Sequence, residues 1–237
     1  MRRLKGTIDK NNRIILSDET IKHARVIRLN VGENVEILTS EGVYDAVVSS
    51  INPLTIQNIG KNEINRELDF NLILFCPLLK GEKFEFVLQK ATELGVKEIY
   101  PFLSKRVIKR IDNSDFLKRK DRYNKIINEA ILQSNRNSNV ILHDLCSLDE
   151  LKVIDASYKF IAYEDEAIDG IHIPNLKLND KSSVICCFGP EGGFDRSEVE
   201  DLIKRGFISI SLGKRILRAE TAALYMLSVV GYLGERD

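Results

Sequence analysis

The order of strand-like and helix-like segments between residues 184 and 233 constrains the fold most. Apolar runs typical of buried strands are twice followed, within a few residues, by a helix-type pattern. In chain order these segments are a strand over 184–188, a helix after Asp195, a strand over 208–212 and an apolar helix over 220–233. The turns 189–193 and 213–219 are rich in glycine or charge. This alternation indicates a parallel sheet with both turns at one edge, the edge where open α/β sheets bind ligands.

The first of these helices carries its own start and stop signals. Asp195 suits the N-cap position, and Glu198, three residues later, completes a capping box. Gly206 is expected to end the helix. The buried stripe predicted from the helical period consists of Val199, Leu202 and Ile203.

The alternation of strands and helices begins near residue 68, whereas the preceding residues have a different character. The segments expected after that point are strands over 72–76, 96–103 and 158–163 and helices over 84–94 and 123–131. Before it we expect short strands over 13–16, 34–38, 43–49 and 54–59 and a brief helix over 21–29. Closely spaced short strands predict a small β-barrel. With the polar stretch 60–68 as a linker, the predicted domains are 1–67 and 68–237.

Composition allows a folded chain with an anionic partner, although it does not require one. Hydrophobic residues make up 43% of the 237 residues, which suits a globular protein with a proper core. The formal net charge is zero, but basic residues crowd 2–28 and 105–125 while acidic residues gather over 144–169. Such separated patches permit binding of an anion on one face, and they are equally compatible with an ordinary solvated surface.

Cysteine usage and hydropathy favour a cytoplasmic protein. Cys76, Cys146, Cys186 and Cys187 form no C-x-x-C pair and have no histidine at ligand spacing, so we expect structural thiols and no metal site. Cys186 and Cys187 are neighbours on a predicted strand, so their side chains should face opposite ways. The N-terminus lacks an apolar signal core, and no apolar run approaches the roughly 20 residues of a membrane span.

The turn 189–193 leaves two interpretations open. Glycines between a strand and a helix allow a ligand to approach the backbone closely, but they also serve simple tight turns. The turn is neither a Walker loop nor G-x-G-x-x-G. Glu191 would repel a phosphate, so a neutral or cationic ligand fits better than a nucleotide phosphate.

The second turn places apolar and charged residues side by side. Ile216 and Leu217 are unusual in a solvated loop and could form a wall for an aromatic group such as adenine. Arg218 beside Glu220 and Thr221 could contact an anion or a base, or could form an ion pair that ties down the loop. The three histidines are scattered, and no G-x-S-x-G or Ser/His/Asp grouping points to a nucleophilic hydrolase.

Two sequence blocks closely resemble signature motifs of a known family. These are G-P-E-G-G-F with Glu198 over 189–198, and L-G-K-R-I-L-R-A-E-T-A over 212–222. Further matching blocks are M-R-R at the start, H-A-R-V-I-R-L over 23–29, Q-K-A-T-E-L-G-V-K-E-I-Y-P over 89–101 and E-A-I-L-Q-S-N-R over 129–136. The chain thus resembles the RsmE family of SPOUT methyltransferases, which methylate a uridine of 16S ribosomal RNA at N3. It departs from the pattern at Lys22-His23, where many members have two histidines, and at Ala219, where Thr is frequent.

The resemblance implies a PUA-like β-barrel before an α/β domain whose C-terminal segment forms a deep trefoil knot. It also implies a homodimer that binds S-adenosylmethionine, the small-subunit ribosomal RNA as partner, and no membrane. The implied cofactor-binding residues are Ala162, Tyr163, Phe188, Gly189, Pro190, Glu191, Gly192, Gly193, Leu212, Gly213, Arg215, Ile216 and Leu217.

The chemistry of N3 methylation assigns roles to a few residues. Arg218 could stabilise negative charge on a uracil carbonyl oxygen, and Glu191 or Glu220 could take the imino proton. Thr221 completes the catalytic group. The residues expected to contact RNA are Arg2, Arg3, His23, Arg25, Arg28, Lys105, Arg106 and Arg136. Two alternatives remain: a ribosome-assembly RNA-binding protein with a vestigial pocket, and a nucleotide-binding enzyme.

Overall fold

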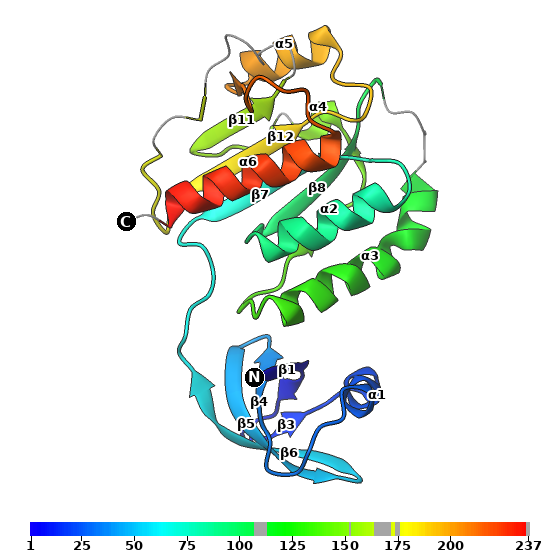
Figure 1. The fold of residues 1–237 in the computed structure, drawn as a ribbon, viewed down its shortest axis with the longest axis vertical. Helices are drawn as coiled ribbons and strands as arrows, with labels where there is room; N and C mark the ends of the chain where they lie inside the picture. Colours follow the sequence, from blue (N-terminus) through cyan, green and yellow to red (C-terminus); the bar gives the residue numbers. More distant parts are fainter. Residues whose placement is uncertain (107–112, 152, 164–171, 174–175, 236–237) are drawn as a thin grey trace. The chain divides into compact units, whose positions relative to one another are not determined.

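The computed structural model describes residues 1–106, 113–151, 153–163, 172–173 and 176–235. The chain divides into two compact units (Figure 1). The first comprises Met1–Glu67 together with Ile131–Ser138, and the second comprises Leu68–Ala130 and Asn139–Asp237. Residues 131–138, which the sequence assigns to the second domain, therefore group with the first unit.

The first unit is built from short strands and one helix. Its elements are β1 (Arg2–Lys5), β2 (Thr7–Ile8), β3 (Ile14–Ile15), α1 (Asp18–Val26), β4 (Asn34–Thr39), β5 (Gly42–Ile51) and β6 (Leu54–Asn62). The sheet has the order β1-β4-β5-β6, with β1 parallel to β4 and the other pairs antiparallel, and β2 and β3 form a separate antiparallel ribbon. The core gathers Leu4, Ala24, Leu29, Val35, Ile37, Ala46 and Val48.

The second unit contains the predicted parallel sheet. Its elements are β7 (Asn71–Pro77), α2 (Glu82–Glu93), β8 (Glu98–Leu103), α3 (Asn113–Gln133, continuing into the first unit from Ile131), β9 (Ile141–Leu142), β10 (Cys146–Ser147), α4 (Leu148–Leu151), β11 (Tyr158–Ala162), β12 (Ser183–Phe188), α5 (Arg196–Lys204), β13 (Ile208–Ile210) and α6 (Ala219–Gly234). The strand order is β10-β8-β7-β12-β11-β13, with β9 also on β8. Every strand pair described in this sheet is parallel.

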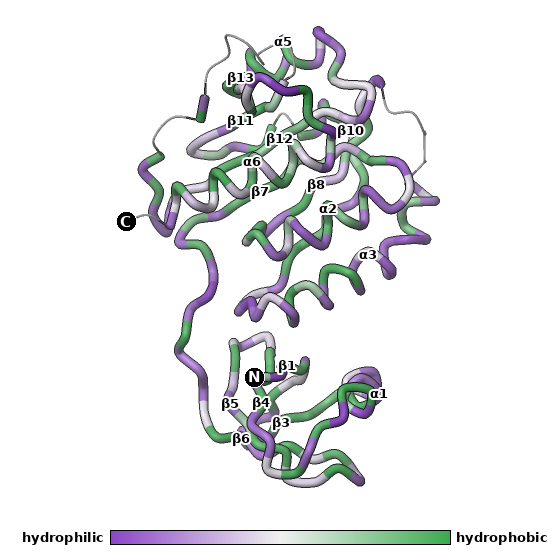
Figure 2. The backbone as a smooth tube through the Cα atoms, in the orientation of Figure 1, coloured by the Kyte–Doolittle hydropathy of each residue, from purple (hydrophilic) through white to green (hydrophobic). Residues whose placement is uncertain are grey.

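Helices cover both faces of this sheet. On one face α4 and α5 pack through residues such as Leu151 and Leu202 against strand residues that include Phe75, Phe102 and Ile185. Helix α6 contacts β12 and α2 on the other face, where α2, α3 and α6 lie together in Figure 1. The central strands β7 and β12 and helix α6 are mostly hydrophobic, as expected for elements enclosed between layers (Figure 2).

The predicted elements near the two turns are present, with differences in detail. Asp195 caps α5, and both hydrogen bonds of the capping box with Glu198 are formed. The predicted buried stripe is wrong at Ile203, which is 47% exposed, because Glu198 turns inward instead. Strand β13 ends at Ile210, so the alternation predicted up to Leu212 does not continue. The loop that a trefoil knot would require after β11 falls largely on residues outside the described part.

Candidate active site

A cavity of about 430 Å³ lies in the second unit at the C-terminal edge of the sheet. This volume is within the range of small-molecule sites. The cavity is formed by the ends of β11 and β12 and by the turns after β12 and β13. The residues that it shares with the predicted cofactor set are Ala162, Tyr163, Phe188, Gly189, Pro190, Glu191, Gly192, Gly193, Leu212, Gly213, Arg215, Ile216 and Leu217. The structure thus brings the whole predicted set together, although its three segments are far apart in sequence.

The first turn is tight as well as close to the cavity. Gly193 has φ +69°, a conformation that disfavours other residues, and its N–H donates to the Pro190 carbonyl at 2.9 Å. A Cβ at Gly192 would lie 2.9 Å from the Arg106 carbonyl oxygen. A Cβ at Gly189 would lie 3.1 Å from the Phe194 ring. These glycines therefore allow the backbone to pack closely on its neighbours while it lines the cavity.

Glu198 fixes the start of α5 against the segment that follows β8. Its side chain is buried and accepts hydrogen bonds from the Ser104 hydroxyl at 3.0 Å and from the Lys105 N–H at 2.9 Å. It also accepts from the Asp195 N–H at 3.0 Å. Because a buried carboxylate needs such donors, Glu198 holds two turns of the sheet edge in one arrangement.

The second turn supplies an apolar wall and a cation. Ile216 is 75% exposed and Leu217 is half-buried, so their side chains are available to an apolar group in the cavity. Arg218 is the N-cap residue of α6 and its exposed side chain also lines the cavity. No hydrogen bond or ion pair of the Arg218 guanidinium is found within the described residues. The predicted alternative of an Arg218–Glu220 ion pair is therefore not formed.

Among the described residues Lys83, and not Arg218, forms ion pairs with the carboxylates near this turn. Its ammonium nitrogen lies 3.5 Å from Oε1 of Glu191 and 3.6 Å from Oε2 of Glu220, and Lys83 itself lines the cavity. Oε1 of Glu191 also accepts the Lys80 N–H at 3.1 Å. Sequence reasoning missed Lys83. The signal was the position of α2 directly after β7, since the turn after any strand of a parallel sheet lies at this same edge.

Glu220 and Thr221 do not line the cavity. Both line a neighbouring, mostly apolar groove of about 620 Å³ along α6, together with Phe86, Leu224, Tyr225, Val229, Tyr232 and Leu233. Thr221 is exposed there, so the structure does not bring it to the cavity with Glu191 and Arg218, the other members of the predicted catalytic group. Lys83 connects the Glu220 carboxylate to the cavity, and within the described residues Oε2 of Glu220 is buried without a hydrogen bond.

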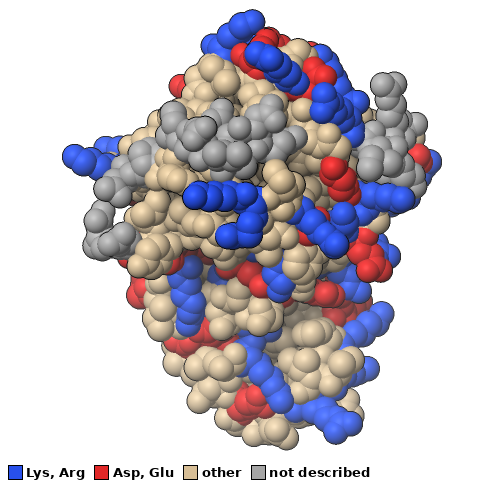
Figure 3. Space-filling model, turned by 45° about the horizontal axis from the view of Figure 1, so that its top comes forward, with Lys and Arg blue, Asp and Glu red and all other residues tan. Residues whose placement is uncertain are grey.

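The basic residues predicted to contact RNA fall into two classes. In the view of Figure 3, Lys and Arg side chains form several groups with acidic side chains between them. Arg2, His23, Arg25, Arg28, Lys105 and Arg106 are exposed. Arg106 lies 3.3 Å from Asp195, and Arg2 lies 3.4 Å from Glu33. These six residues remain candidates for RNA contacts.

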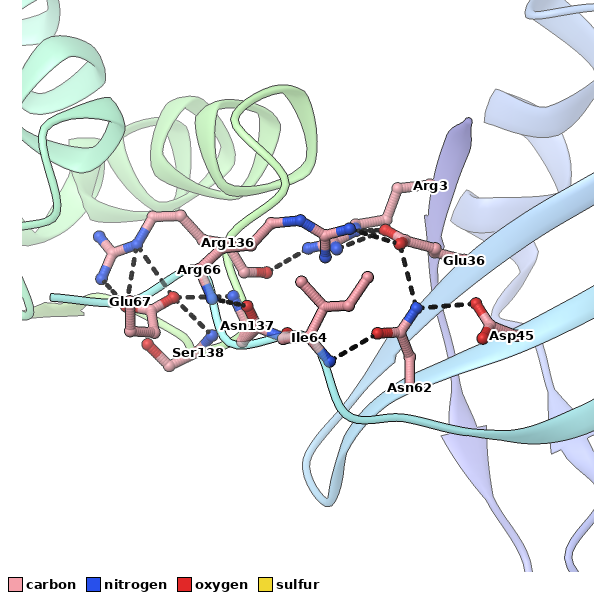
Figure 4. Close-up of polar contacts among 10 residues, drawn as sticks. All are labelled: Arg3, Glu36, Asp45, Asn62, Ile64, Arg66, Glu67, Arg136, Asn137 and Ser138. Atoms are coloured by element: carbon pink, nitrogen blue, oxygen red, sulfur yellow. Dashed lines mark hydrogen bonds and ion pairs between the residues drawn. The ribbon is translucent and has the colours of Figure 1, made fainter. Parts of the chain in front are cut away.

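Arg3 and Arg136 are not available for RNA, and their prediction as RNA contacts is corrected. Arg3 is 5% exposed and its Nε donates to Glu36 at 2.9 Å, while Arg136 is 2% exposed and its Nη2 donates to Glu67 at 2.6 Å (Figure 4). Arg3 also donates to the Arg136 carbonyl, which joins the two pairs. A guanidinium buried against a carboxylate cannot approach a phosphate without breaking that pair.

The cysteines offer no nucleophile. Burial raises the pKa of the thiols of Cys76, Cys186 and Cys187 well above the ordinary value. Burial, followed by the charge of Glu150, raises the pKa of Cys146 to about 12. A protonated thiol is a poor nucleophile and a poor metal ligand. Within the described residues there is no cluster of His, Cys, Asp or Glu that could hold a metal ion, and no helix that could cross a membrane.

Comparisons with known proteins assign this arrangement to a family. The model of the RNA methyltransferase domain matches residues 66–231. Ribosomal RNA small subunit methyltransferase E of Bacillus subtilis is 31% identical over 98% of this chain and 94% of its own length. The chain belongs to this methyltransferase family. The protein of the same name from Mesomycoplasma hyopneumoniae is 35% identical to this chain, over 92% of this chain and 94% of that protein.

Solved structures of similar proteins have the same fold. The Neisseria gonorrhoeae ribosomal RNA small subunit methyltransferase E, bound to S-adenosyl methionine, matches with a TM-score of 0.83 and 26% identity, over 98% of each chain. A putative methyltransferase from Legionella pneumophila, in complex with the bound cofactor SAM, matches with a TM-score of 0.84 and 27% identity, also over 98% of each chain.

Proposed function

We propose that this protein transfers a methyl group from S-adenosylmethionine to N3 of a uridine in 16S ribosomal RNA. The observation that carries the proposal is the cavity, because all the residues predicted for this cofactor converge on it. Family membership and the cofactor-bound relatives support the same conclusion. Cytoplasmic location follows from the substrate.

The lining of the cavity suits S-adenosylmethionine. Exposed Ile216 and half-buried Leu217 offer an apolar surface to the adenine ring, and the glycine backbone of 189–193 allows close approach. A phosphate would meet the carboxylate of Glu191, whereas a sulfonium cation is favoured beside it. The cofactor supplies an activated methyl group, so the protein mainly has to orient the acceptor and exclude water.

The acceptor nitrogen of uridine carries a proton at neutral pH, and two side chains are placed to manage its charge. Arg218 has no partner within the described residues and can donate to a uracil carbonyl oxygen as negative charge develops there. Glu191 lines the cavity, and its Oε1 is engaged by Lys80 and Lys83, which leaves Oε2 to accept the N3 proton. Glu220 is displaced from this role, since its Oε2 is buried outside the cavity.

The other features of the family are part of the proposal. The first unit, with its sheet and the exposed basic side chains of α1, would act as the PUA-like RNA-binding domain. The C-terminal segment would form the trefoil knot. The groove along α6 would be covered in a homodimer. Its exposed aromatic residues are Phe86 (42%), Tyr225 (45%) and Tyr232 (65%). Tyr232→Asp should convert a dimer to a monomer in sedimentation experiments.

Two measurements test the proposed function. Isothermal titration calorimetry should detect S-adenosylmethionine binding and no ATP binding; the reverse would favour a nucleotide-binding enzyme. Mass spectrometry of 16S ribosomal RNA from cells lacking the protein should show the loss of one N3-methyluridine, restored by the purified protein. RNA binding without cofactor binding would instead identify a ribosome-assembly protein with a vestigial pocket.

A further inference from the structure

Lys83 connects two parts of the cavity wall that are distant in sequence. It lies in the first turn of α2, while Glu191 belongs to the turn after β12 and Glu220 to the first turn of α6. Its ammonium nitrogen is within 3.6 Å of a carboxylate oxygen of each. Among the described residues, no other ion pair joins these segments. A third element, α2, is therefore tied to both sides of the cavity.

The two carboxylates depend on Lys83 to different degrees. The side chains of Glu191 and Glu220 are each 16% exposed. Glu191 has a second donor, the Lys80 N–H, at the start of α2, where the helix dipole also favours a negative charge. In the part of the chain that the structure describes, Oε2 of Glu220 is buried without a hydrogen-bond partner, so Lys83 is the cation that compensates it. Loss of the ammonium group would leave the Glu220 carboxylate buried and unpaired.

One partner of Lys83 has a proposed chemical role itself, and the other is close in sequence to a residue that has one. Glu191 is the proposed proton acceptor. Glu220 lies two residues after Arg218, the N-cap residue of α6. An ion pair that fixes the first turn of α6 therefore also fixes the position of the Arg218 backbone. Besides Lys83, Glu191 and Arg218, the charged residue that lines this cavity among those described is Arg215, on the turn after β13.

We propose that Lys83 is a positioning residue for methyl transfer, which orients Glu191 directly and Arg218 through Glu220. This inference rests on the proposed function for its kinetic part. Lys83 itself touches neither reacting atom in this assignment: its ammonium group holds the two carboxylates at a fixed separation, and thereby the turn 189–193 against the first turn of α6. Sub-ångström placement of this kind affects the rate more than the binding of either substrate.

The kinetic test compares Lys83→Met with Lys83→Arg and with a matched control. Lys90→Met is the control because Lys90 lies on the same helix and also pairs with a glutamate, Glu93, at 2.8 Å, but away from the cavity. Lys83→Met should lower kcat about tenfold to a hundredfold and leave cofactor Kd and RNA KM within about twofold. Lys83→Arg should recover most of kcat, and Lys90→Met should resemble the wild type. An effect confined to Kd or KM, or equal effects of the two methionine variants, would overturn the assignment.

A double-mutant cycle and a measurement without substrate complete the test. In a Glu220→Gln background, Lys83→Met should lower kcat by less than it does in the wild type, because part of its action passes through Glu220; full additivity contradicts that route. In the protein without cofactor or RNA, amide hydrogen exchange of residues 189–193 and 219–222 should accelerate in Lys83→Met and not in Lys90→Met. Unchanged exchange would overturn the positioning role. If exchange is faster in Lys83→Met but the wild-type protein methylates no RNA, the role of Lys83 in positioning the two turns stands and the proposed function is rejected.

Discussion

Two groups of basic residues in this protein show how burial decides what an arginine does. In the first unit, Arg3 and Arg136 are buried and each is paired with a carboxylate, Glu36 or Glu67. At the cavity of the second unit, Arg218 is exposed and has no side-chain partner in the part of the chain that the structure describes. All three belong to segments in which charge or motif suggested binding of an anion. Of these three described residues, only Arg218 has guanidinium N–H donors left to bind an anion.

The difference lies in the acceptors that the fold places nearby. Glu36 accepts hydrogen bonds from Arg3 and from Arg66, the latter at 2.9 Å. Glu67 accepts from Arg136 and from the N–H groups of Asn137 at 2.7 Å and Ser138 at 3.1 Å. Both carboxylates are within the first unit, and Glu67 fastens the segment 131–138 to the rest of that unit (Figure 4). At the cavity Lys83, not Arg218, neutralises the nearby carboxylates, so the fold leaves Arg218 unpaired.

Removal of one buried partner should have the largest effect. Arg136→Met leaves the Glu67 carboxylate buried without its cation, which should lower the free energy of unfolding of the first unit by about 3–5 kcal/mol. Urea denaturation, with hydrogen exchange of β4 as the local reporter, measures the loss. The control Arg122→Met removes an arginine of α3 that is 68% exposed and paired with Glu85, and should change stability little. Equal effects would mean that burial is not what separates the two groups.

Removal of the unpaired arginine should affect the reaction and leave the fold intact. Arg218→Ala should reduce kcat about 10²–10³-fold, because a preorganised donor to a developing oxyanion is lost. The melting temperature and cofactor affinity should stay close to the wild type, since Arg218 holds no protein group within the described residues. Arg196→Ala, at an exposed arginine paired with Glu200, is the control for loss of a surface charge. Near-normal turnover of Arg218→Ala would discard its proposed role.

A smaller effect is expected when the close packing behind the cavity is disturbed. Gly192→Ala would place a Cβ 2.9 Å from the Arg106 carbonyl oxygen, a backbone atom that cannot move alone. The turn must shift, which should weaken S-adenosylmethionine binding about tenfold, within the usual cost of overpacking. Calorimetry measures the change. Gly60→Ala has no atom within 4 Å of the new Cβ and should bind like the wild type; a similar loss there would indicate a general effect of the substitution.

The most gradual effect is the pH dependence of the first unit. Burial of Glu36 and Glu67 opposes their ionisation, but hydrogen bonds and charge from their arginine partners outweigh it and hold the pKa of each below the ordinary 4.5. The stabilisation is therefore complete above about pH 4.5 and is lost as pH falls through the folded-state pKa. Each carboxyl contributes a slope of at most about 1.4 kcal/mol per pH unit.

Acid titration followed by hydrogen exchange tests this prediction. Protection in β4 and β5 should fall below pH 4.5, and the fall should be shallower in a Glu67→Gln variant, which has one titrating carboxyl fewer. A flat profile of the wild type between pH 5 and 3 would contradict the assignment of these carboxylates as ionised partners of Arg3 and Arg136.

Local signals in the sequence were sufficient for the turns around the cavity. Gly193 and Gly213 have positive φ, and the capping box of α5 forms, because these features depend on residues only a few positions apart. The parallel sheet also follows from periodicity along the chain. Once the strands are parallel, their C-terminal turns meet at one edge, so the turns 189–193 and 213–219 were expected side by side; Ala162 and Tyr163 were added by the family resemblance, and they line the same cavity.

The partners of individual charges depended on tertiary structure. Arg3 belongs to a basic N-terminus that predicted RNA contacts, yet β1 pairs with β4 and places it against Glu36. The polar stretch 60–68 read as a linker, yet its Arg66 and Glu67 help to bind residues 131–138. Lys83 carries no motif, and only the packing of α2 beside α6 brings it to Glu191 and Glu220.

The sequence by itself thus determined the succession of elements, the two turns and the family, because each is encoded in residues that are close along the chain. The tertiary structure alone decided which arginines bind a carboxylate of the protein and which remains unpaired. An ion pair between residues distant in sequence exists only where folding brings the two side chains together and removes water from between them.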